Sequence, residues 1–555
     1  MKLTKNARLE LTVESFGAEG EGVCRYEGMA VFVQRALPGE RIIAQITRVE
    51  KRYAFARAME ILSASPDRVT PACPYARQCG GCTCQHMAYG AQLAFKRSQV
   101  EGCMRHIAGL SVPVQPVLGM QEPWHYRNKI AVPVSGTAEN PLLGYYAPRS
   151  HRVVDVQRCL IAREEGNQVV AAVRRWMCEW QIAPYDEATH KGIVRHVMMR
   201  ASRAGEVMAV LVINARTLPR ERELIACLRE GVPGLVSVCV SVNMRPDNVI
   251  LGDSYRVLWG QERLRDTLCG NTFLLSPLSF FQVNPEQTER LYRTALDFAQ
   301  LRGDETVADV YCGAGTITLM MARHAARVIG IEIVPDAIRD AKENARLNGV
   351  ENAQFYCGAA EDVLPELVRQ GLRPDVIVLD PPRKGADEAV LRAIAVAQPA
   401  RVVYISCNPA TQARDAKILC AMGYAAQRCQ PVDMFCQTAG VETVVLLSHK
   451  KADSYIHIDV EFGEGEGKIP VDSIAKRAEA YKPKEKVTYK MIKEYIEAKY
   501  GFKVHTAYIA EVKRNLGLPM YDAPNAVEEL KQPRKHPTPE KVEAIKDALR
   551  YFAVI

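Results

Sequence analysis

Apolar and polar residues alternate along the first 62 residues of the chain. The segments LELTV (residues 9–13) and IIAQI (42–46) carry this pattern, and the glycine-rich GAEGEG (17–22) lies between them. Short alternating segments separated by glycine turns are typical of strands that bury one face. We therefore expect residues 1–62 to form a small, OB-like β-barrel.

Residues 63–265 and 266–450 contain longer apolar runs. VMAVLVI (207–213) is apolar throughout, and the first of these regions has the pattern of a mixed α/β domain. In the second region, strand candidates alternate with helical segments, which is the rhythm of a doubly wound, Rossmann-like sheet. Its seven strand candidates are residues 306–310, 327–331, 353–357, 375–379, 401–406, 426–432 and 442–448.

The last segment, residues 451–555, is rich in Lys, Glu and Tyr, and its basic and acidic residues nearly balance. YKMIKEYI (489–496) has the apolar spacing of a helix. We expect a helix-rich accessory domain without catalytic residues. The whole chain is thus predicted to be an α/β protein of four domains: 1–62, 63–265, 266–450 and 451–555.

Composition narrows the class of protein. The chain has 555 residues, 48% of them hydrophobic and 25% charged, as in globular proteins. Its net charge of +8 favours a polyanionic partner. The N-terminus lacks the apolar core of a signal peptide, and no uncharged apolar run reaches about 18 residues. We therefore expect a cytoplasmic protein with no membrane association and no obligate protein partner.

The loop DVYCGAGT (309–316) follows a strand candidate and opens a helix. Its glycines let a ligand approach the backbone, and the helix start offers free N–H groups. Glu332 ends the next strand, where a carboxylate can bind the hydroxyls of a ribose. The spacing differs from that of dinucleotide and phosphate-binding loops. An S-adenosylmethionine site therefore fits better.

Two further strand candidates end in residues that could bind a ligand or take part in catalysis. Asp380 in VLDPPRKG (378–385) lies at the carboxyl edge of the sheet, where such sheets bind ligands. Cys407 in VVYISCNP (402–409) follows a β-branched strand and precedes a proline, and Glu442 begins the last strand. A thiol presented in this way, with a carboxylate available as general base, indicates covalent catalysis.

Together these motifs resemble the RNA uracil-5-methyltransferases, over residues 1–450. The resemblance implies a class I methyltransferase domain in which the Cys407 thiolate adds to C6 of uracil and Glu442 removes the C5 proton. In the segment SFFQVN (279–284), it implies that Phe280 stacks on the target base. The residues that it implies for S-adenosylmethionine binding are Gln282, Tyr311, Gly313, Gly315, Thr316, Glu332 and Asp380.

Seventeen cysteines in a reducing compartment argue against a disulfide framework. Cys73, Cys79 and Cys82 have the spacing C-x5-C-x2-C, and Cys159 can supply a fourth thiolate. Spacing alone leaves zinc and a [4Fe-4S] cluster open. The resemblance implies the cluster, as in the branch that modifies rRNA, with a structural role. Cys84 lies too close in sequence to Cys82 to share in the ligation easily.

The N-terminal barrel resembles a TRAM domain, which implies RNA binding. Basic and aromatic side chains are the expected contacts to a nucleic-acid backbone and its bases. The candidates are Arg25, Tyr26, Arg48, Lys51, Arg52 and Tyr53.

Through the same resemblance, the cysteine cluster and the barrel imply 23S rRNA as the substrate, with tRNA as the alternative, because the tRNA enzymes of the family commonly lack both. An adenine amino-methyltransferase is disfavoured, because it would carry an aromatic residue where this chain has Arg383 and would not need Cys407. A noncatalytic iron–sulfur RNA-binding protein would leave Cys407 and Glu442 without a role. The chain departs from the family at Cys436 and Gln437, where relatives often have Pro and His.

Overall fold

The computed structural model describes residues 3–450, 489–516 and 537–551. The chain divides into two compact units, Met1–Ser454 and Tyr455–Ile555. Among the described residues, no helix has the length and apolar character that crossing a bilayer requires.

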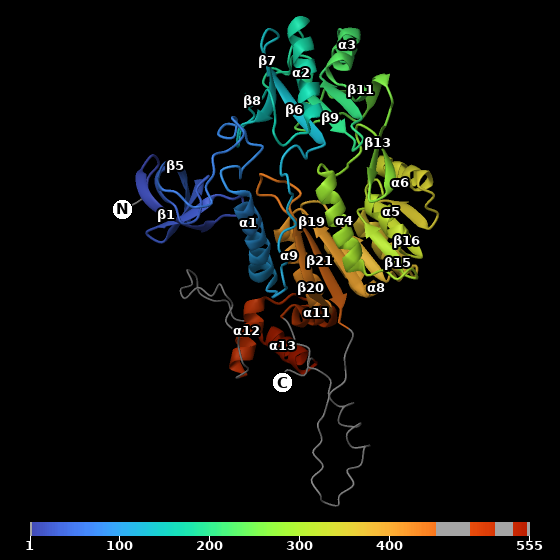
Figure 1. Ribbon diagram of the computed structural model, residues 1–555. Helices are drawn as coiled ribbons and strands as arrows, with labels where there is room; N and C mark the ends of the chain where they lie inside the picture. Colours follow the sequence, from blue (N-terminus) through green and yellow to red (C-terminus); the bar gives the residue numbers. More distant parts are fainter. Residues whose placement is uncertain (1–2, 451–488, 517–536, 552–555) are drawn as a thin grey trace, which may run out of the picture. The chain divides into compact units, whose positions relative to one another are not determined.

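The first five strands close into a barrel in the order β1-β2-β3-β5-β4, drawn in blue in Figure 1. The alternating pattern has the expected effect, because Leu11 and Val13 of β1 are buried in the barrel while their neighbours Glu10 and Thr12 are exposed. The barrel predicted from the alternation is therefore confirmed. Its strands are β1 (Arg8–Phe16), β2 (Gly22–Tyr26), β3 (Met29–Gln34), β4 (Arg41–Val49) and β5 (Tyr53–Ser63).

A mixed sheet of seven strands follows, in the order β12-β11-β10-β9-β6-β7-β8. Strand β10 is buried at every position, because α2 and α3 cover one face of the sheet and the core of the next domain covers the other. This explains the uninterrupted apolar run. The elements are α1 (Tyr89–Gly102), a π-helical turn (Cys103–Ala108), β6 (Lys129–Gly136), β7 (Pro141–Tyr146), β8 (Val153–Asp155), α2 (Glu164–Glu179), β9 (Val194–Ala201), β10 (Val207–Ile213), α3 (Glu221–Gly231), β11 (Leu235–Val242) and β12 (Tyr255–Gly260).

The third region is a seven-stranded sheet in the order β17-β16-β15-β18-β19-β21-β20, in which only β21 runs antiparallel to its neighbours. A hairpin and helix α4 precede it. All seven strands predicted from the sequence are present, which confirms the doubly wound fold. The elements are β13 (Leu264–Leu268), β14 (Asn271–Leu275), α4 (Pro285–Ala299), β15 (Thr306–Val310), α5 (Thr316–Ala322), β16 (Arg327–Glu332), α6 (Pro335–Leu347), β17 (Ala353–Cys357), α7 (Ala360–Arg369), β18 (Val376–Leu379), α8 (Glu388–Ala397), β19 (Arg401–Ser406), α9 (Pro409–Ala421), β20 (Tyr424–Val432) and β21 (Glu442–His449).

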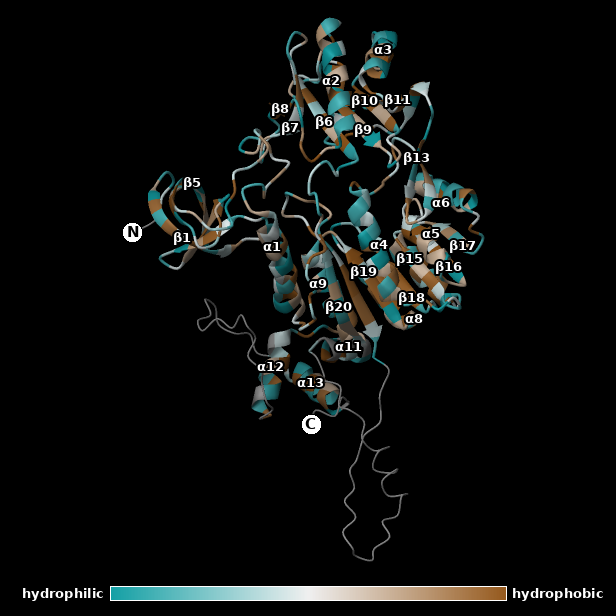
Figure 2. Cartoon of the chain, viewed as in Figure 1, coloured by the Kyte–Doolittle hydropathy of each residue, from teal (hydrophilic) through white to brown (hydrophobic). Residues whose placement is uncertain are grey.

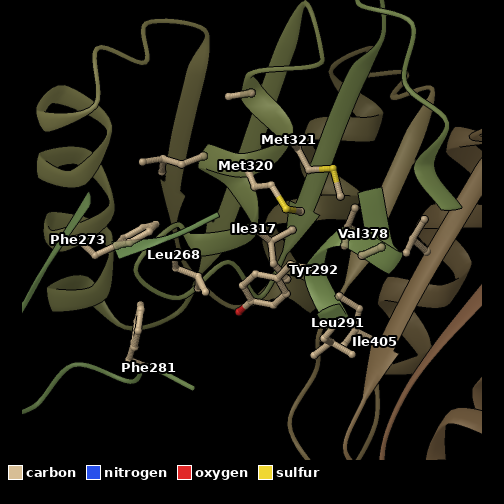
Figure 3. Close-up of a cluster of buried hydrophobic side chains, with 14 of the residues drawn as sticks. Leu268, Phe273, Phe281, Leu291, Tyr292, Ile317, Met320, Met321, Val378 and Ile405 are labelled. Carbon is tan, nitrogen blue, oxygen red and sulfur yellow. The ribbon is translucent and has the colours of Figure 1, made fainter. Parts of the chain in front are cut away.

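Helices cover both faces of this sheet. On one face, Tyr292 of α4 and Ile317 and Met320 of α5 pack near Val378 of β18 (Figure 3). On the other face, α7, α8 and α9 contribute a second core. Figure 2 shows the hydrophobic residues concentrated in the strands, with hydrophilic residues along the outer surfaces of the helices. The carboxyl ends of the parallel strands are left to form a site.

The C-terminal unit contains three described helices, α11 (Tyr489–Tyr500), α12 (Thr506–Asn515) and α13 (Pro539–Tyr551). They share a small core of their own, which includes Ile492, Ile496, Ile509, Ile545 and Leu549. The helix predicted for residues 489–496 is confirmed.

Candidate active site

Cys407 and Glu442 lie at the ends of two paired strands. β19 and β21 are antiparallel neighbours, and Ser406 is the register partner of Thr443. Continuing that register by one residue places Cys407 opposite Glu442. The buried side chain of Gln412 holds the two strand ends together: its Nε2 donates to the carbonyl oxygens of Tyr404 (2.8 Å) and Thr443 (3.2 Å). The candidate nucleophile and base therefore share one edge of the sheet.

The backbone around Cys407 is fixed by the start of helix α9. The Asn408 side chain caps this helix by accepting from the Ala410 N–H (3.1 Å), and its amide donates to the Arg383 carbonyl (3.0 Å). Burial raises the pKa of the Cys407 thiol, and the Glu442 carboxylate raises it further. The Arg383 guanidinium opposes both effects through its charge and a hydrogen bond. A cation and a helix start are two features that favour a thiolate.

Arg383 is a site residue that sequence reasoning missed. The sequence motif gave it no role in the chemistry, yet its charge acts on both Cys407 and Glu442. Its place directly after the Asp380 loop was the available signal, because that loop lies beside the strand that carries Cys407.

Glu442 is only 4% exposed, and no hydrogen bond to its carboxylate is found within the described residues. Burial raises its pKa well above the ordinary range, Asp380 raises it further, and Arg383 opposes the shift. A buried carboxyl group with a raised pKa is suited to take a proton near neutral pH.

The loop expected to bind S-adenosylmethionine, residues 309–316, contains residues with positive φ angles. Tyr311, Gly313 and Gly315 have φ angles of +72°, +55° and +84°. A Cβ atom at Gly313 would meet no other atom within 4 Å, so open space lies beside the backbone there, whereas at Gly315 it would lie 2.9 Å from Leu319 Cδ1. Gly313 thus leaves room for a ligand, and Gly315 allows close packing.

The neighbouring strands bring polar groups to the same loop. The Glu332 carboxylate accepts from the backbone N–H of Gly313 (3.1 Å) and of Val334 (2.9 Å). Thr316, the first residue of α5, has its hydroxyl 3.0 Å from that of Tyr292. Asp380 follows β18, the strand paired with β15, so its carboxyl group belongs to the same edge. These groups fit S-adenosylmethionine.

An exposed apolar side chain that sequence reasoning missed lies beside this loop. Ile333 is 61% exposed, directly after Glu332. The next residue, Val334, is also exposed, so two apolar side chains face solvent directly after β16.

Phe280 and Gln282 lie in the segment between β14 and α4. Phe280 is 70% exposed, whereas Phe281 is buried against Phe273 (Figure 3). Gln282 is buried. The ring of Phe280 is therefore exposed, whereas that of Phe281 belongs to the core.

Four cysteines predicted as ligands approach one another. Burial raises the pKa of Cys82 to about 12, and Cys159, Cys79 and Cys73 all contribute to the increase. Cys159 likewise acts on the thiols of Cys73 and Cys79. Cys84, in contrast, is buried beside Lys96 and Asp433. Within the described residues, no group of three or more His, Cys, Asp or Glu side chains is placed to hold a single metal ion.

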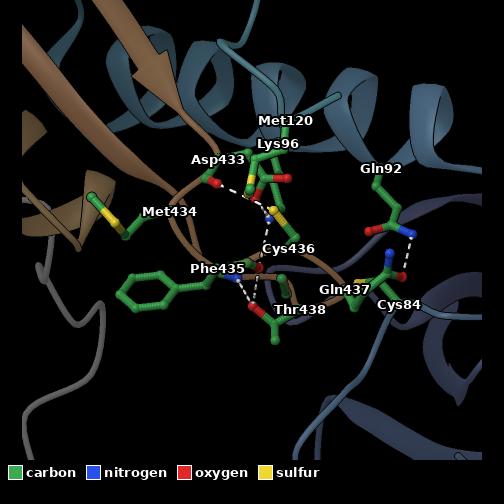
Figure 4. Close-up of polar contacts among 12 residues, drawn as sticks. Cys84, Gln92, Lys96, Met120, Asp433, Met434, Phe435, Cys436, Gln437 and Thr438 are labelled. Atoms are coloured by element: carbon green, nitrogen blue, oxygen red, sulfur yellow. Dashed lines mark hydrogen bonds and ion pairs between the residues drawn. The ribbon is translucent and has the colours of Figure 1, made fainter. Parts of the chain in front are cut away.

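The loop before Glu442 is tied to the cysteine segment (Figure 4). The Gln437 carbonyl accepts from the N–H groups of Thr83 (3.1 Å) and Cys84 (3.0 Å). Lys96 of α1 forms a fully buried ion pair with Asp433. Cys436 and Gln437, where the chain departs from the family pattern, are both buried in this contact.

The basic and aromatic candidates of the barrel lie at its surface. Arg25, Arg48 and Tyr53 are exposed, and the Arg48 guanidinium lies over the Phe55 ring, 5.0 Å from its centre. Phe32, Tyr53 and Phe55 contact one another ring to ring. Such a surface can stack bases and bind phosphates.

Two family models match the chain. Residues 272–450 match the tRNA (uracil-5-)-methyltransferase family, and residues 2–59 match the TRAM domain. A protein of Halalkalibacterium halodurans, named as an uncharacterized RNA methyltransferase, is 48% identical over 450 residues, which cover 81% of this chain and 98% of that protein. An RNA methyltransferase of Clostridium tetani is 43% identical over 446 residues, 80% of this chain and 97% of the relative.

The chain belongs to the RNA uracil-5-methyltransferase family. It is therefore an enzyme, an RNA methyltransferase with S-adenosylmethionine as methyl donor, and its barrel is a TRAM domain. A solved structure, the tRNA (uracil-54, C5)-methyltransferase of Pyrococcus abyssi in complex with S-adenosyl-L-homocysteine, is similar to this chain with a TM-score of 0.65. The two are 27% identical, and the match covers 79% of this chain and 99% of that one. The predicted family and fold class are confirmed.

Proposed function

We propose that the protein methylates C5 of a uridine in 23S rRNA through a covalent adduct between Cys407 and C6 of the base. The observation that carries the mechanism is the strand register that places Cys407 opposite Glu442. Uracil C5 is too weak a nucleophile to take a methyl group directly. A thiolate at one edge of the base and a carboxylate next to it supply what the reaction lacks.

The Cys407 thiolate forms a bond to C6, and the displaced electron pair makes C5 enolate-like. C5 then attacks the methyl carbon of S-adenosylmethionine, which is consumed as a substrate and leaves as S-adenosylhomocysteine. Glu442 takes the proton from C5, the C6–sulfur bond breaks, and the thiolate returns with release of 5-methyluridine. Arg383 favours the thiolate form before attack and after release.

The donor is proposed to occupy the loop at Tyr311, Gly313, Gly315 and Thr316. Glu332 would bind its ribose, and Gln282 and Asp380 would contact its remaining polar groups. Phe280 would stack on the uracil once the base has left its helix.

Cys73, Cys79, Cys82 and Cys159 are proposed to hold a [4Fe-4S] cluster, which would supply a structural crosslink. The donor set is supported by the Gly81 N–H, which donates to Cys79 Sγ (3.3 Å), and by the closeness of Cys159 to the other three thiols, whose pKa values it raises. Hydrogen bonds of this kind tune cluster sulfurs. Iron analysis after anaerobic purification tests the proposal, and stoichiometric zinc without iron would overturn it.

Covalent trapping tests the mechanism. RNA that contains 5-fluorouridine has no C5 proton to lose, so the adduct with Cys407 should accumulate and survive denaturing electrophoresis. Cys407→Ala should abolish this band, because no sulfur is left to form the bond. With ordinary RNA, Glu442→Gln should accumulate an adduct, since elimination needs the base. Methylation by Cys407→Ala at the unaltered rate would refute the proposed nucleophile.

Transfer RNA is the second candidate substrate, because the Pyrococcus abyssi enzyme is named for a tRNA position. The cysteine set and the TRAM domain support rRNA. Mapping 5-methyluridine in both RNAs, from cells with and without the protein, separates the two. Lost rRNA methylation is the expected result, and lost tRNA methylation with unchanged rRNA would overturn the choice of 23S rRNA.

A further inference from the structure

Two cationic side chains are direct partners across an antiparallel strand pair. Lys129 of β6 and Arg200 of β9 face each other in register. Side chains at directly opposed positions project from the same face of a sheet, and like charges placed there destabilise it. Arg200 is 3% exposed, and its buried Nε has no hydrogen-bond partner among the residues that the structure describes. The pairing is therefore costly to the fold.

In the described part of the chain, neither Lys129 nor Arg200 makes an ion pair with a carboxylate. Burial, Arg200 and Arg127 together lower the pKa of Lys129 to about 7, so Arg127 is a third positive charge nearby. The acid that acts on Arg200 is Asp266, whose Oδ1 accepts from two backbone N–H groups. Three basic side chains thus lie close together, and no carboxylate in the described part of the chain forms an ion pair with Lys129 or Arg200.

The position of the pair suggests what supplies the missing charge. Arg200 donates a hydrogen bond to the Ser279 carbonyl, one residue before Phe280. The N–H of Asn128, which lies between Arg127 and Lys129, donates to the Val283 carbonyl (2.9 Å). The cations therefore border both ends of the segment that carries the exposed Phe280 ring.

We propose that Arg127, Lys129 and Arg200 form a binding subsite for an RNA phosphate adjacent to the target uridine. The inference rests on the proposed function, which places the target base on Phe280. A phosphate bound there would supply the negative charge that the β6–β9 pair lacks. It would also anchor the backbone from which the base is turned out.

The test compares Lys129→Gln with the conservative Lys129→Arg in the full-length protein. The probe is an rRNA fragment that the unaltered protein methylates. Loss of one charged phosphate contact should raise KM for this RNA about tenfold. It should also reduce the slope of log affinity against log salt by about 0.7. Lys129→Arg should keep the KM and the salt slope of the unaltered protein.

A matched control is Lys417→Gln. Lys417 is an exposed lysine of α9. At a rise of 1.5 Å per residue, it lies about 12 Å along the helix from Pro409, the first residue. This variant should keep the unaltered KM and salt slope. A second probe is the same RNA with uncharged methylphosphonate linkages on both sides of the target uridine. The unaltered protein should bind it less tightly, and Lys129→Gln should lose no further affinity.

Thermal denaturation and S-adenosylhomocysteine binding separate the subsite from other roles. Removing one of two opposed cations should leave the Tm equal or higher. A lowered Tm with unchanged RNA KM would assign the pair to the fold and overturn the subsite. Weakened S-adenosylhomocysteine binding with an unchanged salt slope would show that these side chains act on the methyl donor instead of the RNA. That result would also overturn the subsite. Failure of the unaltered protein to methylate any RNA would instead refute the proposed function.

Discussion

At the residue scale, the site concentrates carboxyl groups that are costly to bury. Burial raises the pKa of Asp309 to about 7, and Glu332 adds to the shift. Burial likewise raises the pKa of Asp380 to about 7, with Asp309 contributing. Within the described ranges of the chain, the buried Oδ1 of Asp309 has no hydrogen-bond partner, although Thr318 donates to Oδ2 (2.5 Å). A cationic ligand such as S-adenosylmethionine, if bound there as proposed, would offset this repulsion between carboxylates.

Asp309→Asn tests this cost. The folded-state pKa of about 7 exceeds the unfolded value of about 3.9. The folded protein therefore binds more protons between these values, and its stability falls as pH rises from about 4 to 7. The asparagine variant does not lose stability in this way. The Tm of the variant minus the Tm of the unaltered protein should therefore be larger at pH 8 than at pH 5. Thermal scans without donor measure this, with the exposed Asp304→Asn as control. An equal difference at both pH values would contradict the pKa shift.

At the element scale, helix α1 positions the loop that leads into Glu442. Lys96 and Asp433 are both fully buried, and Lys96 Nζ also donates to the Phe435 carbonyl (3.1 Å). The Tyr89 hydroxyl donates to the second oxygen of Asp433 (2.7 Å). These contacts join residues more than 330 positions apart in the sequence. The cysteine-bearing segment and the candidate base are thus held by one buried polar network.

Lys96→Met should lower the free energy of unfolding by about 3–5 kcal/mol, because Asp433 is left buried without its counterion. It should also slow methylation, since the loop before Glu442 loses an anchor. Urea denaturation and single-turnover rates measure the two effects. Arg97→Met removes an exposed ion pair with Glu101 from the same helix and should cost less than about 1 kcal/mol.

The double variant Lys96→Met/Asp433→Asn checks the cause. It removes the orphaned charge while keeping an acceptor for Tyr89, so it should recover much of the lost stability. A double variant as unstable as Lys96→Met would show that packing, rather than charge, is responsible.

At the scale of the whole molecule, local sequence patterns predicted the strands and helices. They did not predict which residues of distant strands face each other, because that depends on long-range strand register. Each strand and helix between residues 306 and 448 has its own short pattern of apolar and polar residues, so these elements can be predicted from the sequence. The facing of Lys129 and Arg200 depends on how β6 meets β9 across 71 positions, which no local pattern reveals. The role of Arg383 likewise needs the contact between two neighbouring strand ends. Cys407 and Glu442 were predicted as nucleophile and base from their places at the ends of two strand candidates, and the family resemblance then implied their roles on uracil.

The same reasoning predicts that the enzyme does not need its C-terminal unit. The family match ends at residue 450, and relatives that align with about 450 residues of this chain are covered almost completely. The last strand of the catalytic sheet ends at His449, and the core of the C-terminal unit consists of its own residues. A chain that ends at Ser454 should therefore keep its Tm for the catalytic unit, its S-adenosylhomocysteine affinity and, within about twofold, its kcat on a short RNA. Cys407→Ala in the shortened chain provides the inactive baseline. A loss of donor binding or of folding on truncation would show that residues 455–555 complete the catalytic unit.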